Sequence, residues 1–195
     1  MKCLFLLLLF SPVGSSILLP IDVPDRTDSR YIQLTEIGEF GIPRKERPTV
    51  PAHLHTGIDI RRPTNNYIDE PIYAIAEGVV ISIRRDGPFA QIIIEHRVNG
   101  QFFWSLYEHI AGIKVSIHDE VSTSKEIARF FSREELDRYG WQFDHFHFEV
   151  LKREPIRLAE DTNHPERYFA SYTLQCKTQS DLDRYYYAPV GFFRH

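Results

Sequence analysis

Apolar residues, many of them β-branched, gather in short runs between residues 71 and 151, and some runs alternate with polar positions. Such runs predict β-strands. Asn99-Gly100, which lies between two of the runs, is a strong signal for a tight hairpin turn. The pattern therefore predicts a mainly β fold, a compact antiparallel β-sheet or sandwich domain with little helix. Strands are expected over residues 72–76, 78–83, 90–96, 101–107, 114–117, 126–130 and 143–151.

One short helix is expected near residues 133–139. Ser132 and Glu135 have the spacing of a capping box, in which the Ser hydroxyl accepts a hydrogen bond from the third helical amide and the Glu side chain reaches back. Gly140 suits the position that follows the last helical residue.

The segments on either side of this predicted core show less pattern. Residues 17–50 carry scattered proline and charged residues with little periodicity, which predicts an extended N-terminal arm. Residues 153–195 are polar and rich in tyrosine, and we expect them to pack on the domain as a C-terminal extension. The chain is therefore expected to have four parts, with a signal peptide at 1–16 and the main domain at 51–152 beside the arm and the extension.

The N-terminus has the features of a signal peptide. Lys2 provides a positive charge, residues 3–10 are apolar, and Val13 and Ser15 fit the small-residue positions before a cleavage site. The apolar run is too short to span a bilayer, and an uncleaved signal anchor is the alternative. We therefore expect an exported protein of the periplasm, cell envelope or extracellular space, with no transmembrane span after cleavage near Ser15 or Ser16.

Composition narrows the classes of function. An apolar fraction of 43% is sufficient for a real core in a chain of 195 residues, which we expect to form one domain with extensions. A formal charge of −4 provides no basic surface, so we expect no nucleic-acid partner. After signal cleavage only Cys176 would remain, which excludes an internal disulfide and slightly favours a bound metal as a source of stability. The oligomeric state does not follow from the sequence.

Two groups of polar residues carry the candidate chemistry. His145 and His147 are two positions apart on a predicted strand, so their side chains point to the same face. His55 and Asp59 bracket Gly57 and can approach one ion from a turn. Two imidazoles and one carboxylate, from His55, Asp59 and His147, are ligands that zinc prefers, and they leave a position for water. The sequence therefore indicates a metal-dependent hydrolase, in which His145 lies close to the ion, either as a base or as a further ligand.

Three segments resemble motifs of one known family, in the family's order and spacing. His55-Thr-Gly-Ile-Asp59 with residues 71–80, Tyr107-Glu-His109-Ile110, and His145-Phe-His147-Phe-Glu-Val are similar to the motifs of the lysostaphin-type (LytM-like) zinc metalloendopeptidases. The resemblance covers roughly residues 50–152. It implies a compact antiparallel β domain, of the duplicated hybrid motif type, with the metal on the floor of a long groove.

The resemblance also implies roles for five side chains. His55, Asp59 and His147 would bind one zinc ion per chain. His145 would act as the general base on the attacking water, and His109 would polarise that water or steady the oxyanion. The reaction implied is hydrolysis of a peptide bond in the cross-links or stem peptides of bacterial peptidoglycan.

The sequence departs from the family pattern in three places. Residues 118–124 lack both glycines of a family motif, residues 132–144 replace a short glycine-rich turn, and residues 61–70 are longer than usual. These segments would rim the groove, so they leave the implied chemistry intact but leave the substrate specificity open. Two alternatives follow: a non-catalytic module that binds or activates other wall hydrolases, and a zinc peptidase that acts on a non-wall protein. The arm at 17–50 could also cover the groove in a latent form.

Four further residues near the motifs have open interpretations. Tyr107 could line the groove or belong to the core, and Glu149 could support a metal ligand or form an ion pair at the rim. His53 is interpreted as a surface residue or as a supporting residue behind a ligand. His96 is expected at the solvent-exposed surface.

Overall fold

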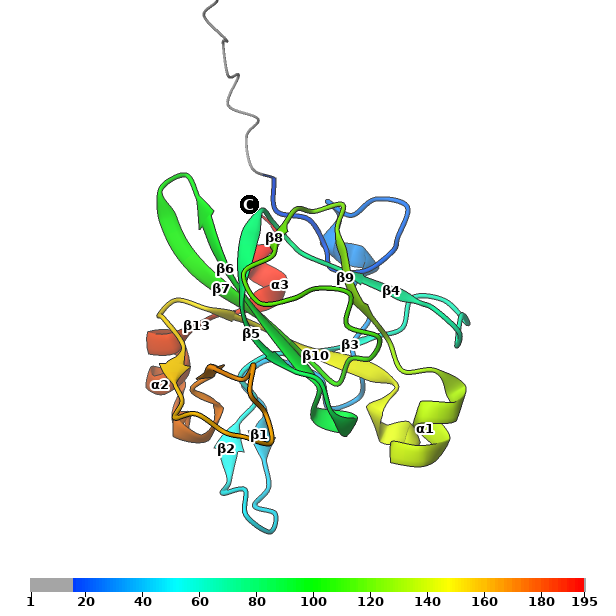
Figure 1. Ribbon diagram of the computed structural model, residues 1–195. Coiled ribbons are helices and arrows are strands. Elements are labelled where there is room, and N and C mark those ends of the chain that lie inside the picture. Colours follow the sequence, from blue (N-terminus) through cyan, green and yellow to red (C-terminus); the bar gives the residue numbers. More distant parts are fainter. Residues whose placement is uncertain (1–15, 195) are drawn as a thin grey trace, which may run out of the picture.

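A twisted antiparallel sheet forms the centre of the molecule in the computed structural model, which describes residues 16–194 (Figure 1). The strand order is β13-β10-β7-β6-β5-β8, and β3 also pairs with β10. The predicted signal peptide, apart from Ser16, lies outside the described residues. The strands of this sheet are β3 (Ile58–Arg61), β5 (Gly78–Arg84), β6 (Gln91–Val98), β7 (Gln101–Glu108), β8 (Glu120–Val121), β10 (His145–Leu151) and β13 (Tyr186–Tyr187).

Smaller elements surround this sheet. Three two-stranded sheets pair β1 with β2, β4 with β9 and β11 with β12. Their strands are β1 (Pro43–Arg44), β2 (His53–Leu54), β4 (Pro71–Tyr73), β9 (Glu126–Arg129), β11 (Ile156–Arg157) and β12 (Phe169–Ala170). The helices are α1 (Arg133–Tyr139), α2 (Gln179–Tyr185) and α3 (Pro189–Phe192), with 3-10 turns η1 (Ser29–Tyr31), η2 (Gly87–Phe89), η3 (Trp141–Phe143) and η4 (Thr173–Gln175). The mainly β, antiparallel fold predicted from the sequence is confirmed.

Strand β10 has a central position because it pairs along both edges. Along one edge it pairs with β7, and along the other with β3 over residues 145–148 and with β13 over residues 150–151. In this register His147 lies directly opposite Asp59. Two candidate ligands that are 88 residues apart in sequence therefore become cross-strand neighbours.

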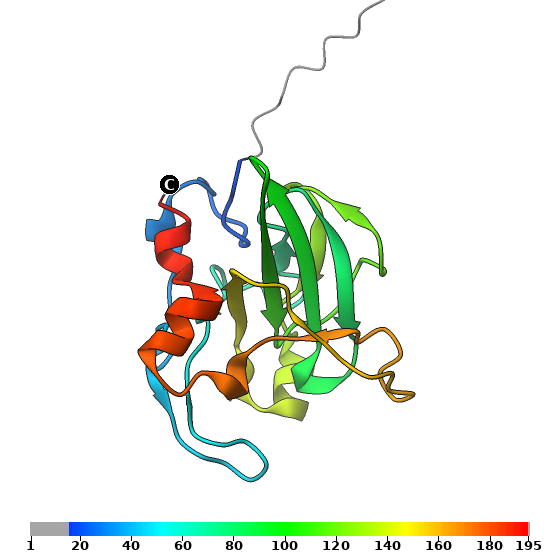
Figure 2. The same cartoon turned by 90° about the vertical axis from the view of Figure 1, so that its left-hand side faces the viewer.

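Buried side chains pack on both faces of the sheet. Two successive residues of β7 illustrate this, since Tyr107 belongs to the larger apolar cluster and Leu106 to a second one. The second cluster includes Cys176 and Leu182 of the C-terminal extension. Figure 2 shows α2 and α3 stacked along one side of the molecule and the β1–β2 hairpin below them. The C-terminal segment therefore contributes buried residues of its own.

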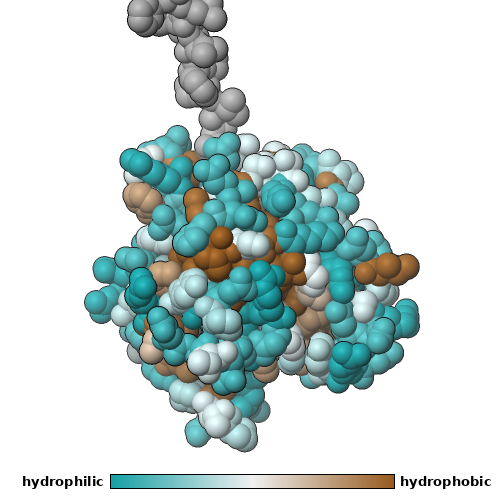
Figure 3. Space-filling model, viewed as in Figure 1, coloured by the Kyte–Doolittle hydropathy of each residue, from teal (hydrophilic) through white to brown (hydrophobic). Residues whose placement is uncertain are grey.

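Apolar side chains reach the surface on the face that Figure 3 shows. On the face seen in Figure 3, apolar residues gather over the central strands and hydrophilic residues surround them. Between residues 16 and 194, no helix has the length and apolar character needed to cross a bilayer.

The predicted elements agree with the structure at most positions. Helix α1 spans Arg133–Tyr139 and carries the full capping box of Ser132 and Glu135. Asn99 and Gly100 have φ values of 50° and 81°, the left-handed conformations that a type I′ hairpin turn requires. The prediction of a strand at residues 114–117 is wrong. That segment is a loop, and the Lys114 amide donates a hydrogen bond to the Ile127 carbonyl oxygen of β9.

Candidate metal centre

The candidate centre lies where a turn crosses closely over β10. His55 follows β2, and the chain then passes through Gly57 into β3, which carries Asp59. A Cβ atom at Gly57 would lie 2.3 Å from the Phe148 carbonyl oxygen and 2.8 Å from Cε1 of His147. Only a residue without a side chain fits there, so glycine permits the close approach that brings the turn onto His147.

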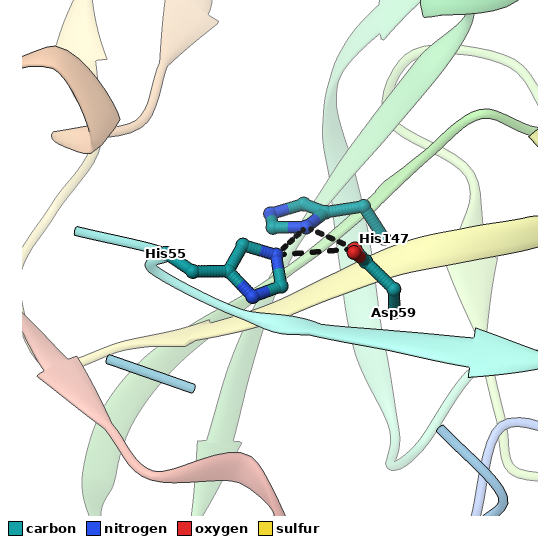
Figure 4. A group of neighbouring side chains, drawn as sticks. All are labelled: His55, Asp59 and His147. Carbon is teal, nitrogen blue, oxygen red and sulfur yellow. Dashed lines mark hydrogen bonds and ion pairs between the residues drawn. The ribbon is translucent and has the colours of Figure 1, made fainter. Parts of the chain in front are cut away.

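Three atoms form a nearly equilateral triangle at this point (Figure 4). His55 Nε2 lies 3.1 Å from Asp59 Oδ1 and 3.0 Å from His147 Nδ1, and the last two atoms are 3.0 Å apart. Tetrahedral zinc with ligands at about 2.0 Å requires ligand atoms about 3.3 Å apart. The three side chains therefore match the donor types and nearly the spacing of a zinc site.

Each of the three candidate ligands also contacts a group outside the triangle. His55 Nδ1 lies 2.7 Å from the Glu39 carbonyl oxygen, and Arg44 donates to Asp59 Oδ2 at 2.7 Å. His147 Nε2 lies 3.1 Å from Glu149 Oε1. Such outer partners fix which ring nitrogen or carboxylate oxygen faces a metal.

Glu149 is held in place by two hydroxyl groups. Its side chain is 1% exposed, and Oε1 accepts hydrogen bonds from the hydroxyls of Thr56 and Thr173. The structure therefore places Glu149 behind the candidate ligand His147 and not in an ion pair at the rim. Two other residues had open interpretations. Tyr107 is fully buried in the core, and His53 is nearly buried, with Nδ1 2.8 Å from the Pro51 carbonyl oxygen.

The charges of the three candidate ligands differ. Burial raises the pKa of Asp59, but the hydrogen bond from His147 and the charge of that ring outweigh burial and hold the pKa far below its usual range. Burial lowers the pKa of His147, but the hydrogen bonds and charges of Asp59 and Glu149 outweigh it and raise the pKa to about 10. For His55, burial dominates and lowers the pKa. Without a metal the triangle thus holds a carboxylate, an imidazolium and a neutral imidazole.

Two further histidines lie beside the triangle. His145 Nε2 is 3.8 Å from Asp59 Oδ1, and burial lowers the pKa of His145 to about 4, so its ring is neutral at pH 7. The ring of His109 lies edge-on to that of His145, with centroids 5.4 Å apart. Nδ1 of His109 lies 2.6 Å from the Pro88 carbonyl oxygen, so Nδ1–H donates and Nε2 stays free to accept. The structure brings together all five side chains singled out in the sequence.

The two longest departures from the family pattern contact each other. Arg62 is nearly buried, and its guanidinium donates to Asp144 Oδ1 at 3.1 Å and to the Phe131 carbonyl oxygen at 2.6 Å. The hydroxyl of Tyr67 donates to the other oxygen of Asp144 at 3.1 Å. The segment at 61–70 and the one at 132–144 therefore form one unit, which ends at the residue before His145.

Sequence reasoning missed two supporting groups and misplaced one histidine. Glu39 and Arg44 belong to the arm, and no local pattern distinguishes them from other arm residues. The expectation that His96 lies at the surface is wrong. Its side chain is fully buried, with Nδ1 2.9 Å from the Glu77 carbonyl oxygen and Nε2 2.7 Å from the Ser105 hydroxyl. The alternation of Ile92, Ile94 and His96 on one face of β6 was the available signal.

Comparisons with known proteins agree with this picture. Residues 53–158, more than half of the chain, match Peptidase family M23. No curated protein sequence matches the chain.

Several solved structures are similar to parts of the chain. A zinc-containing peptidase from Vibrio cholerae is 26% identical, with a TM-score of 0.48, over 70% of this chain and 37% of that one. SpoIIQ in the SpoIIQ–SpoIIIAH pore-forming complex is 17% identical, with a TM-score of 0.46, over 71% and 85% of the two chains. The antimicrobial peptidase lysostaphin from Staphylococcus simulans is 21% identical, with a TM-score of 0.45, over 63% and 44%. This chain thus spans little more than a third of the Vibrio cholerae chain.

Proposed function

Because the chain belongs to peptidase family M23, we propose that it is a zinc metalloendopeptidase that hydrolyses peptide bonds in bacterial cell-wall peptidoglycan. The observation that carries the proposal is the triangle of His55, Asp59 and His147 with two further histidines beside it. Three protein ligands with a position left for water are typical of catalytic zinc sites, whereas structural sites have four.

The proposed ligands would give the site the charge that this chemistry needs. One carboxylate and two neutral imidazoles would hold a zinc ion with a net charge of about +1. A zinc ion bound there would polarise a carbonyl oxygen and lower the pKa of a bound water toward ~7. His55 and Asp59 are already in the required protonation states, and His147 must lose its proton first.

The two remaining histidines would handle protons. His145 is neutral at pH 7 and presents Nε2 toward the triangle, so it would accept the proton of the attacking water and pass it to the leaving amine. His109 would accept a hydrogen bond at Nε2 from the water, because Pro88 holds its Nδ1–H. A His109 that had already taken a proton from solvent at Nε2 would instead donate to the oxyanion of the tetrahedral intermediate.

The motif resemblance supports the wall substrate. The closing His-x-His-Phe-Glu-Val segment and the opening His-Thr-Gly-Ile-Asp segment are similar to those of wall-lytic endopeptidases. Export follows from the expected signal peptide at residues 1–16, since peptidoglycan lies outside the cytoplasmic membrane. We therefore place the proposed activity in the periplasm, the cell envelope or the medium.

The test combines digestion with metal analysis. Purified protein loaded with zinc is incubated with peptidoglycan fragments and, separately, with unfolded protein substrates, and products are identified by mass spectrometry. We expect new amino termini from wall peptides, and a loss of at least a hundredfold for His145→Ala. His118→Ala is the matched control and should cleave normally, because His118 is exposed and lies just before β8, four strands away from β10 in the sheet.

Other outcomes would contradict the proposal in distinct ways. Absence of bound zinc, or full activity of His145→Ala, would refute the enzymatic assignment. Zinc binding without any cleavage would favour the non-catalytic module. Cleavage of unfolded protein but not of wall fragments would favour a peptidase with a non-wall substrate.

A further inference from the structure

Two phenylalanines from different loops meet against the ring of His109. The ring centroid of Phe143 lies 4.8 Å from that of His109, and the centroid of Phe89 lies 5.7 Å away. The two phenylalanine rings contact each other edge to face, with centroids 6.0 Å apart. In Figures 1 and 2 the segments that carry them, η2 and η3, lie side by side at one end of β10.

This cluster leaves apolar surface open to solvent beside the candidate centre. Phe89 is 43% exposed, and Phe143 is half-buried. A single exposed phenylalanine needs no explanation, and Phe102 at the far end of the β6–β7 hairpin is 48% exposed. Phe89 differs because it joins a second aromatic ring and a proposed catalytic histidine into one apolar wall. Apolar surface of this kind next to polar groups is typical of a binding site.

The residues next to the two rings are anchored by hydrogen bonds on both sides of the wall. In η2, the Pro88 carbonyl oxygen accepts the hydrogen bond from His109, so the residue before Phe89 is fixed to the histidine that Phe89 contacts. In η3, the residue after Phe143 is Asp144, which Arg62 and Tyr67 bind through both carboxylate oxygens. A partly buried hydrogen bond thus anchors the residue beside each ring. The wall is therefore preformed and needs little reordering to bind a side chain.

We propose that Phe89 and Phe143 form the subsite that determines specificity, and that it receives an apolar side chain of the substrate residue next to the scissile bond. This inference rests on the proposed function. The wall adjoins His109, which would contact the reacting water and oxyanion, so a side chain on the wall belongs to a residue that flanks the cleaved bond. An apolar side chain gains from burial there. Glycine gains nothing, and a charged side chain loses hydration.

A merely structural role for the two rings makes a different prediction. If Phe89 only supported the orientation of His109, its removal would lower kcat/KM for every substrate by the same factor. If it binds a substrate side chain, its removal would lower kcat/KM for apolar substrates and leave glycine substrates less affected. The ratio of the two kcat/KM values separates these cases. That ratio does not depend on the fraction of active enzyme, so partial misfolding or metal loss does not change it.

The experiment measures that ratio. The cleaved bond is first located by mass spectrometry of wall digests, and synthetic peptides are then made with leucine, glycine or glutamate at each of the two flanking positions. For the wild-type protein we expect leucine to exceed glycine in kcat/KM by about tenfold at one position. Phe89→Ala should bring the ratio close to one, whereas Phe89→Leu should keep most of it. Phe102→Ala, an equally exposed phenylalanine away from the wall, should leave the ratio unchanged.

Several results would overturn the inference. The wild-type protein could show no preference at either position, or it could prefer glycine or glutamate over leucine. The Phe89→Ala variant could also lose activity equally on all peptides. In each case cleavage still occurs, so the proposed function stands while the subsite fails. If the wild-type protein cleaves neither wall fragments nor peptides, both proposals fail together.

Discussion

The Nε2 atom of His147 lies 3.1 Å from Oε1 of the buried Glu149. The ring therefore directs its other nitrogen, Nδ1, toward Asp59 and His55. His55 has the opposite arrangement, since its Nδ1 contacts the Glu39 carbonyl and its Nε2 faces the triangle. Both arrangements are imposed by groups behind the rings, so the candidate ligands are oriented before any metal arrives.

Because Glu149 contacts His147, we expect a mutation of Glu149 to lower the affinity for zinc. Glu149→Gln keeps the size of the side chain but removes the charge that favours the Nε2–H form of His147. We expect zinc affinity to fall by about ten- to a hundredfold, measured by competition with a chromophoric chelator. Glu120→Gln, an exposed carboxylate on β8, is the control and should bind zinc like the wild type. Equal affinity in both variants would mean that Glu149 does not support the ligand.

Zinc binding should release a proton from His147. Its pKa is raised to about 10, so the metal-free protein carries an imidazolium there at pH 6.5, and the metal must displace that proton. Affinity should therefore rise about tenfold per pH unit above pH 6.5 and level off as pH approaches the pKa of His147. Calorimetric titrations at pH 6.5 in two buffers of different ionisation enthalpy would give a release close to one proton. Heats that are independent of the buffer would contradict a protonated His147.

Because of the buried His96, we expect the free energy of unfolding to fall in mild acid. Burial lowers its pKa to about 4, whereas an unfolded histidine has a pKa near 6.5. Between these values the unfolded chain binds a proton that the folded protein excludes, so the free energy of unfolding falls as pH falls from 6.5 to 4. A difference of about 2.5 pKa units corresponds to about 3 kcal/mol at most. Above pH 6.5 the contribution is constant.

Denaturant unfolding at several pH values would measure this effect. His96→Gln can keep contacts to Glu77 and Ser105 but cannot take up a proton, so its stability should depend less on pH between 6.5 and 4 than that of the wild type. Other buried histidines titrate in the same range, and the comparison of the two proteins removes their contribution. Parallel pH profiles would show that His96 is not the responsible group.

Removal of the arm should weaken the protein instead of activating it. Leu19 and Ile21 are fully buried, and each contributes about 1.5–3 kcal/mol by burial. The arm also supplies the contacts of Glu39 to His55 and of Arg44 to Asp59. Deletion of residues 17–45 should therefore lower the melting temperature by more than ten degrees or prevent folding. Deletion of residues 1–16 alone is the control. A trimmed protein with normal stability and higher activity would instead support a latent form blocked by the arm.

The sequence was informative where function depends on local spacing. The pairs His55–Asp59 and His145–His147 are each close in sequence, so a turn or a strand brings them onto one side. The capping box of α1 is equally local. A second capping box, Thr178 with Asp181, begins α2 and was present in the sequence of the C-terminal segment, although that segment was expected to be a polar extension without assigned helices.

The sequence was uninformative where function depends on distant pairing. Arg44 reaches Asp59 because β1 pairs with β2, and two-residue strands leave no periodic signal. Phe89 and Phe143 meet only because two irregular segments converge on His109. Register and loop conformation decide such contacts, and neither follows from spacing along the chain.

The supports of the triangle come from both sides of the segment that matches the family. Glu39 and Arg44 precede residues 53–158, and Thr173, which donates to Glu149, follows them. A protein engineer who transplanted only the matching segment into a fusion would carry over every candidate ligand but leave part of its scaffolding behind. The portable unit is instead the stretch from Glu39 to Thr173, with the flanking residues that anchor it.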